Sequence, residues 1–133
     1  DIRTTPFDVT GDGDTAQGIA HSIATLHRRL GGAIQLYAAE VAGTPIVYDA
    51  QAFPYFFTDS DNDGIAGKGE TIFPNRYQSW TPRLLKAAYN YHFVTKDPGA
   101  YTHNPYYTIQ LLQDSLADLG DAVAIDLSGL TRP

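Results

Sequence analysis

Residues 59–70 carry oxygen ligands at the spacing of a calcium-binding loop. They read Asp-Ser-Asp-Asn-Asp-Gly-Ile-Ala-Gly-Lys-Gly-Glu, with carboxylates at loop positions 1, 3, 5 and 12 and a glycine at position 6. A calcium ion takes six to eight oxygen atoms from a short, sharply turned segment. The pattern therefore predicts a calcium site whose ligands are the side chains of Asp59, Asp61, Asp63 and Glu70 and the backbone carbonyl of Ile65.

Within this loop, Glu70 is expected to close the coordination shell with both carboxylate oxygens. Gly64 permits the turn at positive φ, and Gly67 offers only a carbonyl or a bridging water at position 9. The alternative interpretation is an acidic, glycine-rich surface turn that binds no metal. Because all five diagnostic positions match, we favour calcium.

A second acidic segment, residues 8–14, reproduces positions 1, 3, 5, 6 and 7 of such a loop. Its candidate ligands are Asp8, Thr10, Asp12 and Asp14. The twelfth position is Ile19, so the bidentate carboxylate is missing. Two interpretations remain: a helix N-terminus rich in acids because of the helix dipole, or a second calcium site completed from elsewhere. A distant carboxylate, water or a neighbouring molecule would complete it, and in the last case calcium would bridge molecules.

The four histidines offer no recognisable catalytic or zinc arrangement. His21 and His27 are six residues apart and belong to no His-Glu-x-x-His motif, so we expect both at the surface. His92 and His103 stand among tyrosines, where aromatic packing or capping is expected, with axial ligation of a neighbour's haem as the alternative. No nucleophile elbow or phosphate-binding loop is present, and the carboxylate pairs are explained by calcium. We therefore expect no enzymatic activity.

These candidate ligands must be positioned by a mainly α fold. Apolar residues at helical spacing predict helices at about 15–42, 81–96 and 105–119. Thr81-Pro82 and Asn104-Pro105 resemble helix starts. In the first helix the apolar stripe comprises Ile19, Ile23, Leu26, Leu30, Ile34, Tyr37 and Val41. The chain is thus expected to form one domain, 1–133, built as a small bundle of about three helices.

The connections carry further signals. The Gly31-Gly32 pair predicts either a break in the first helix or a close helix contact, and Gly43 is expected to end that helix. A short strand is expected at 46–48. The loop 59–70 lies between short aromatic or β-branched stretches, which predicts an irregular or hairpin-like excursion and excludes a helix-loop-helix EF-hand. The segment 121–133 is expected to lie extended over the helices.

Composition excludes several classes of partner and cofactor. The 133 residues carry a net charge of −6 and no basic stripe, which argues against nucleic acid. There is no cysteine, so no c-type haem can be attached within this chain. No stretch of about 18 apolar residues is present to span a membrane. Calcium loops suit calcium-rich surroundings, so we expect an extracellular protein, processed from a longer precursor.

Four blocks resemble a known family: Phe-Asp-Val-Thr-Gly-Asp-Gly-Asp-Thr at 7–15, Phe-Pro-Asn-Arg-Tyr at 73–77, Trp-Thr-Pro-Arg-Leu-Leu-Lys-Ala-Ala-Tyr-Asn-Tyr at 80–91 and Lys-Asp-Pro-Gly-Ala-Tyr-Thr-His-Asn-Pro at 96–105. They are similar to the C-terminal, non-haem region of bacterial extracellular multihaem c-type cytochromes. The resemblance implies an exported, modular, calcium-binding helical domain. It does not imply electron transfer here, because the Cys-x-x-Cys-His motifs of the haem domain are absent.

Three hypotheses for function follow. The favoured one is an extracellular structural protein that binds two calcium ions, which stabilise the fold and bridge subunits into a homopolymer or fibre. The second is an accessory, haem-free domain that docks on a multihaem cytochrome. The third is a carbohydrate-binding module, which exposed aromatic residues beside the 59–70 loop would favour.

Overall fold

The computed structural model describes residues 18–67, 69–97, 104–125 and 127. Its elements in chain order are α1 (Ile19–Tyr37), the π-helical turn η1 (Ala38–Ala42), β1 (Ile46–Tyr48), β2 (Phe56–Thr58), the 3₁₀ turn η2 (Phe73–Asn75), α2 (Pro82–Lys96) and α3 (Pro105–Gly120). The expected mainly α fold, three helices with a short β-hairpin and a loop excursion, is confirmed.

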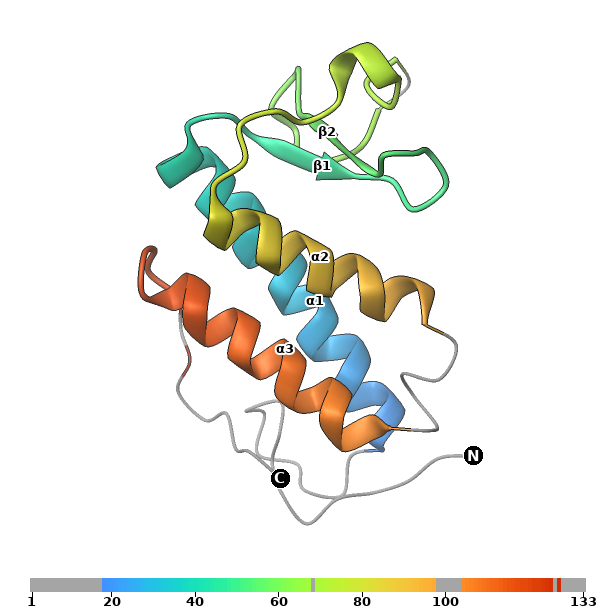
Figure 1. The fold of residues 1–133 in the computed structure, drawn as a ribbon, viewed down its shortest axis with the longest axis vertical. Coiled ribbons are helices and arrows are strands. Elements are labelled where there is room, and N and C mark those ends of the chain that lie inside the picture. The colour runs from blue at the N-terminus through green and yellow to red at the C-terminus, as the bar shows by residue number, and fades with distance from the viewer. Residues whose placement is uncertain (1–17, 68, 98–103, 126, 128–133) are drawn as a thin grey trace.

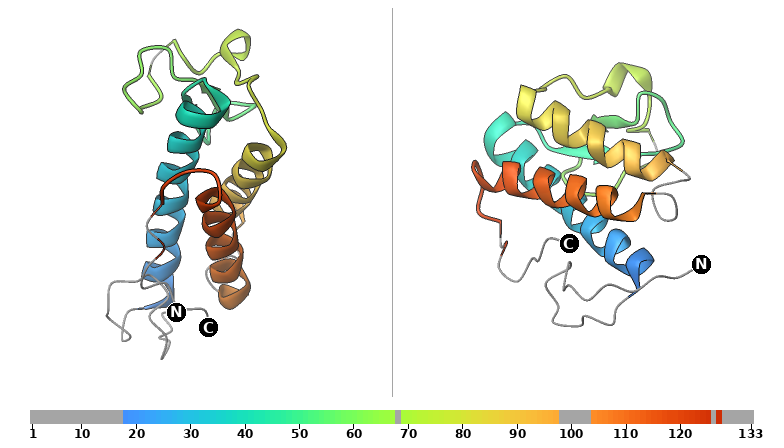
Figure 2. Two further views of the ribbon diagram at one scale, coloured as in Figure 1. Left: turned by 90° about the vertical axis from the view of Figure 1, so that its left-hand side faces the viewer. Right: turned by 60° about the horizontal axis from the view of Figure 1, so that its bottom comes forward.

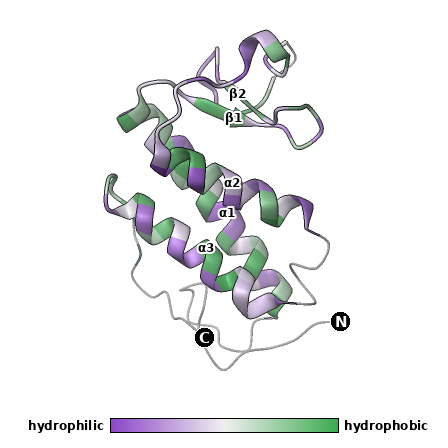
Figure 3. Ribbon diagram, in the orientation of Figure 1, coloured by the Kyte–Doolittle hydropathy of each residue, from purple (hydrophilic) through white to green (hydrophobic). Residues whose placement is uncertain are grey.

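The three helices form two layers. Helices α2 and α3 lie side by side, and α1 packs against both of them (Figures 1 and 2). Each helix turns its apolar residues towards the others, which gives the alternating hydropathy along the ribbons in Figure 3. Leu26, Leu84, Ile109, Leu112 and Leu116 are almost fully buried in this core. The hairpin and the excursion that follows it pack at one end of the bundle (Figure 1).

Helix α1 passes through the glycine pair without a break. A Cβ atom built at Gly31 would lie 3.0 Å from Cε1 of Tyr91, so the missing side chain lets the ring of α2 approach the α1 backbone. Of the two predicted consequences of the glycine pair, the close helix contact is therefore correct. Gly32 has no such neighbour, because a Cβ atom there would meet nothing within 4 Å.

The end of the first helix differs from the expectation in one respect. The last turn, η1, is π-helical and ends at Gly43, whose φ of +84° matches the predicted glycine stop. A π-helical turn accommodates one more residue than an α-helical turn and so rotates the residues that follow it. Val41 is therefore 46% exposed, and its predicted place in the apolar stripe is wrong.

The starts of α2 and α3 follow their sequence signals. Thr81 caps α2, because its side-chain oxygen accepts a hydrogen bond from the Leu84 N–H. Asn104 precedes Pro105 at the start of α3 but makes no side-chain cap. After Gly120, the predicted end of α3, Val123 is buried and Ile125 packs against the core.

The β-hairpin is covered on both faces. Strands β1 and β2 are antiparallel, with Val47 opposite Phe57 and Tyr48 opposite Phe56. Phe56 and Tyr48 belong to the core shared with the helices, so alternation turns Val47 and Phe57 to the other face. Both are nearly fully buried, which means that the excursion after β2 covers that face.

An aromatic cluster joins the hairpin to α1 and α2. His27 stacks on Tyr91 with ring centroids 3.9 Å apart, and His92 stacks on Tyr55 at 4.1 Å. The Tyr48 hydroxyl and His92 Nδ1 are 2.7 Å apart. Aromatic packing of His92 is thus confirmed. The surface position predicted for His27 is wrong, because the ring is half-buried, whereas His21 is exposed and His103 lies outside the described residues.

The half-buried His27 makes folding sensitive to pH. Burial lowers the pKa of His27 and of His92 below the ordinary value. On acidification below about pH 6.5, the unfolded chain therefore takes up protons first, and stability falls until the folded-state pKa is reached. At pH 7.5 both states are neutral and this contribution is complete. In chelator, this histidine contribution should lower the melting temperature between pH 7.5 and 5.5, and the comparison with a histidine variant separates it from the titration of Asp61, whose raised pKa acts in the opposite direction.

The control for this pH effect is an exposed histidine. His27→Gln should flatten the acid branch of the melting temperature, whereas His21→Gln should leave it unchanged. An acid branch identical in the wild type and His27→Gln would assign the effect to other groups.

Among the described residues, no helix is both long and apolar enough to cross a membrane.

Candidate metal centre

The predicted calcium loop connects β2 to η2. Asp59 follows the last residue of β2, and Glu70 precedes η2 by two residues. The loop turns through Asn62 at φ +58°, Gly64 at φ +77° and Gly69 at φ +92°. Glycine reaches such φ values without strain, as expected for Gly64, and asparagine is among the side chains that tolerate them best. The flanking elements are a strand and a 3₁₀ turn, so the predicted absence of an EF-hand is confirmed.

Four carboxylates converge inside this loop. One oxygen from each of Asp59, Asp61, Asp63 and Glu70 lies within 4.8 Å of the others. Asp59 and Glu70 are buried, whereas Asp61 and Asp63 are exposed. Carboxylate oxygens that surround a common centre are the ligands that calcium prefers. The arrangement can hold one divalent cation between two inner and two outer carboxylates.

The two buried carboxylates also organise the backbone of the loop. Glu70 accepts hydrogen bonds from the Ser60 and Gly67 N–H groups, each at 2.6 Å. Asp59 Oδ2 accepts one from the Gly64 N–H at 2.7 Å. These bonds join the first and last positions of the loop. They hold both carboxylates in place before any ion arrives.

The pKa values of the two exposed carboxyl groups, Asp61 and Asp63, depend on each other. The pKa of the Asp61 carboxyl is raised to about 6, chiefly by its hydrogen bond with the Asp63 side chain. The pKa of Asp63 is lowered, chiefly by the hydrogen bond from the Ile65 N–H. As the pH falls, Asp61 therefore takes up a proton before Asp63 does. A divalent cation neutralises the same charge, and its binding releases that proton.

Two amide side chains that the sequence analysis did not identify support the loop. Asn75 Nδ2 donates to the carbonyls of Thr58 and Glu70, both at 2.9 Å, and so ties the entry of the loop to its exit. Gln35 Nε2 on α1 donates to the Gly64 carbonyl at 2.9 Å. Gln35 lies on α1, 29 residues from Gly64, and Asn75 lies in η2, beyond the end of the loop, so the calcium-loop pattern of 59–70 includes neither residue.

The chain that leaves the loop is anchored to the end of the first helix. The Tyr77 hydroxyl donates to the Thr44 carbonyl at 2.7 Å, and burial raises the Tyr77 pKa to about 12. The Ser79 hydroxyl donates to Thr44 Oγ1 at 2.8 Å. The loop is therefore held at its exit as well as at β2.

Removing the Asn75 amide should weaken metal binding without touching a ligand. Asn75→Ala leaves the carbonyls of Thr58 and Glu70 without their donor, so the two ends of the loop separate more easily. Loss of a side chain that holds a metal ligand in position typically lowers metal affinity by roughly 10-fold to 100-fold. Calcium titration calorimetry of Asn75→Ala against the exposed control Gln78→Ala measures this loss. Equal affinities would show that Asn75 does not support the site.

The structure describes the predicted ligands of the 59–70 loop but not those of the 8–14 segment. The four carboxylates of 59–70 lie together as predicted, and Ile65 lies in the same loop with its side chain 68% exposed. Coordination by its carbonyl, like coordination by the carboxylates, stays a prediction. Asp8, Thr10, Asp12 and Asp14 lie outside the described residues.

Comparison with curated proteins shows where this sequence recurs. Over 98 aligned residues, 68% of this chain, it is 33% identical to the C-type polyheme cytochrome OmcC of Geobacter sulfurreducens. Identity to OmcB, over the same length, is 31%. The chain is homologous to a segment of bacterial polyhaem cytochromes. This confirms the resemblance to multihaem cytochromes that the four sequence blocks indicated.

The homologous segment is a small part of those polyhaem cytochromes. The chain spans 13% of the length of OmcC and of OmcB. No family model matches the chain. No solved structure matches it either. Since this chain has no cysteine, what it shares with the polyhaem cytochromes is not a c-type haem attachment site of its own.

Proposed function

We propose that this protein is an extracellular, non-catalytic structural domain that binds calcium and assembles through it. The observation that carries the proposal is the convergence of four carboxylates on one centre in the 59–70 loop. Their spacing in the sequence and their arrangement in space agree with the same ion. Calcium loops of low affinity bind their ion where the calcium concentration is millimolar, as it is outside cells.

Calcium would stabilise the excursion that covers the hairpin. In the described part of residues 59–76, the regular structure is limited to η2 and a bridge between Phe57 and Arg76. The segment nevertheless covers the buried ring of Phe57. Without an ion, the four carboxylates repel one another and weaken this cover. A bound cation reverses that repulsion and couples metal binding to folding.

Assembly is supported by apolar side chains that the fold leaves in solvent. Phe53 is 72% exposed, Tyr89 67% and Phe73 53%. An acidic chain with exposed apolar side chains gains from a partner surface once cations neutralise its charge. The incomplete loop at 8–14 would supply a second ion, bridged by a carboxylate of the neighbouring subunit.

The homology supports a second candidate, an accessory role beside haem-bearing proteins. OmcC and OmcB are polyhaem cytochromes by name, and their homologous segment belongs to a much longer chain. In this role the protein would stay monomeric and dock on a cytochrome. Carbohydrate binding has less support, because Phe73 beside the loop already has Arg76 over its ring at 4.2 Å.

Particle size in calcium and in chelator distinguishes these functions. Sedimentation of the purified chain in a few millimolar calcium should show large particles that dissolve when chelator is added. Asp12→Ala should reduce association more than folding if the 8–14 segment bridges subunits. A monomer under both conditions would reject the polymer and favour the accessory role, for which binding to a polyhaem cytochrome is then measured.

A further inference from the structure

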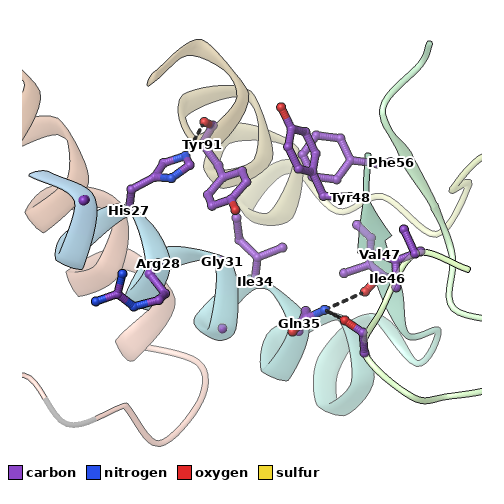
Figure 4. A pocket seen from close by; sticks show the side chains of 14 residues that line it. His27, Arg28, Gly31, Ile34, Gln35, Ile46, Val47, Tyr48, Phe56 and Tyr91 are labelled. Atoms are coloured by element: carbon purple, nitrogen blue, oxygen red, sulfur yellow. Dashed lines mark hydrogen bonds between the residues drawn. The ribbon is translucent and has the colours of Figure 1, made fainter. Parts of the chain in front are cut away.

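A cleft of about 430 Å³ lies between α1, the hairpin and the metal loop. His27 and Tyr91 stand at one end, and Gln35 and Ile46 at the other (Figure 4). Its volume is within the range of small-molecule sites. None of the functions proposed above uses this cleft.

The cleft combines aromatic rings with a stretch of α1 that contains two glycines. Tyr48, Phe56 and Tyr91 supply rings from the hairpin and α2. Helix α1 contributes Gly31 and Gly32 together with side chains such as those of Ile34 and Gln35. Packing against Tyr91 explains Gly31, whereas Gly32 faces open space in the middle of a helix, where glycine is unfavourable. A planar group that lies against the helix backbone would require the missing side chain at Gly32.

A cation stands at the His27 end of the cleft. Arg28 is exposed, and Figure 4 shows its guanidinium pointing away from the rings of His27 and Tyr91, at the mouth of the cleft. It has no ion pair with any residue that the structure describes. An exposed arginine that pairs with none of the described residues, at the mouth of a cleft with aromatic rings, favours a ligand with an anionic group.

The metal loop forms the remaining wall. Gly64 and Ala66, loop positions 6 and 8, line the cleft. Gln35 Nε2 donates to the Gly64 carbonyl at 2.9 Å and to the Ile46 carbonyl at 3.4 Å, so one amide joins α1 to the loop and to β1. Loosening of the loop therefore displaces a wall of the cleft.

We propose that this cleft binds a small planar aromatic anion and that calcium in the 59–70 loop strengthens the binding. The rings of Tyr48 and Phe56 pack on the plane of the ligand, Gly32 leaves room for its edge, and the exposed Arg28 side chain turns towards the cleft to pair with its anionic group. The dependence on calcium rests on the proposed function, whereas the ligand site rests on the cleft alone.

The test uses 8-anilino-1-naphthalenesulfonate, a planar aromatic sulfonate that fluoresces when bound. One molecule should bind per chain in calcium. Gly32→Leu and Ala24→Leu place a larger side chain at the cleft and should weaken binding by at least about tenfold. The matched control is Ala117→Leu on the exposed side of α3, which should bind as the wild type does. Leucine has a higher helix propensity than the glycine it replaces at position 32, so the Gly32→Leu variant should remain folded.

Two further comparisons test the anion and the calcium. Arg28→Gln should weaken the sulfonate by roughly twofold to fivefold and leave the neutral N-phenyl-1-naphthylamine unchanged. Chelator should weaken the sulfonate several-fold in the wild type. Calcium binding is measured separately by calorimetry. If the wild type binds no calcium but Gly32→Leu still weakens probe binding, the metal site is rejected and the cleft is supported. Equal probe binding by wild type, Gly32→Leu and Ala24→Leu would overturn the ligand site.

Discussion

Asp63→Ala should remove most of the thermal stabilisation that calcium gives this protein, while its melting temperature in chelator stays the same or rises slightly. Asp63 is exposed, and the hydrogen bond that its carboxylate accepts from the Ile65 N–H lies within the loop. Folding without calcium should therefore not depend on this side chain. Its removal takes one carboxylate from the cation and relieves repulsion with Asp61. Asp59 and Glu70 are less suitable, because they also hold the loop backbone.

The size of this effect follows from mass action. A ligand present at about one hundred times its dissociation constant stabilises the folded state by about 2.7 kcal/mol. Loss of one of four carboxylates should raise the dissociation constant enough to remove most of that gain at the same calcium concentration. Melting curves in calcium and in chelator, with calorimetric titration, measure both quantities.

The matched control removes the same charge elsewhere. Glu40→Ala deletes an exposed carboxylate in η1, outside the loop. It should leave the response to calcium intact. If Asp63→Ala lowers the melting temperature equally in calcium and in chelator, the acidic loop is a structural turn and binds no stabilising ion.

Phe57→Ala should destabilise the protein by about 3–5 kcal/mol and weaken calcium binding together with it. Phe57 is fully buried on the face of the hairpin that the excursion covers. Truncating a buried phenylalanine leaves a cavity whose cost is of that size, a large fraction of the roughly 5–15 kcal/mol that stabilises a typical domain. Asp59 lies two residues further along the chain, so the cavity left by Phe57 also weakens the packing that supports the 59–70 loop.

Urea unfolding and calcium calorimetry measure the two consequences of Phe57→Ala. The matched control is Phe53→Ala in the hairpin turn, where the ring is 72% exposed and its loss should cost little. Hydrogen exchange locates the change: amides of the hairpin and of residues 69–77 should lose more protection than those of α3. Unchanged calcium affinity would show that the loop folds independently of the hairpin.

Much of the secondary structure was predictable because its signals are local. Thr81-Pro82 and Asn104-Pro105 marked the starts of α2 and α3, and Gly43 marked the end of the first helical segment. Capping and the φ preference of glycine act within one turn of the chain, so they can be inferred without tertiary contacts. The four carboxylates of the 59–70 loop were predictable for the same reason.

Contacts between distant segments were not predictable. The half-burial of His27 depends on Tyr91, 64 residues away, whose ring stacks on it and whose carbonyl lies 3.0 Å from its Nε2. The exposure of Val41 depends on a π-helical turn that the apolar stripe does not reveal. Asn75 and Gln35 support the loop through hydrogen bonds that no spacing pattern encodes.

The sequence by itself determined the mainly α fold, the acidic loop and the absence of attached haem, because each depends on residue type and local spacing. Only the tertiary structure decided that two carboxylates of the loop are buried and two exposed. It also decided that Gly64 lines a cleft opposite α1. Burial and clefts arise where segments far apart in the chain pack together, and that packing depends on the shapes of all the side chains at once.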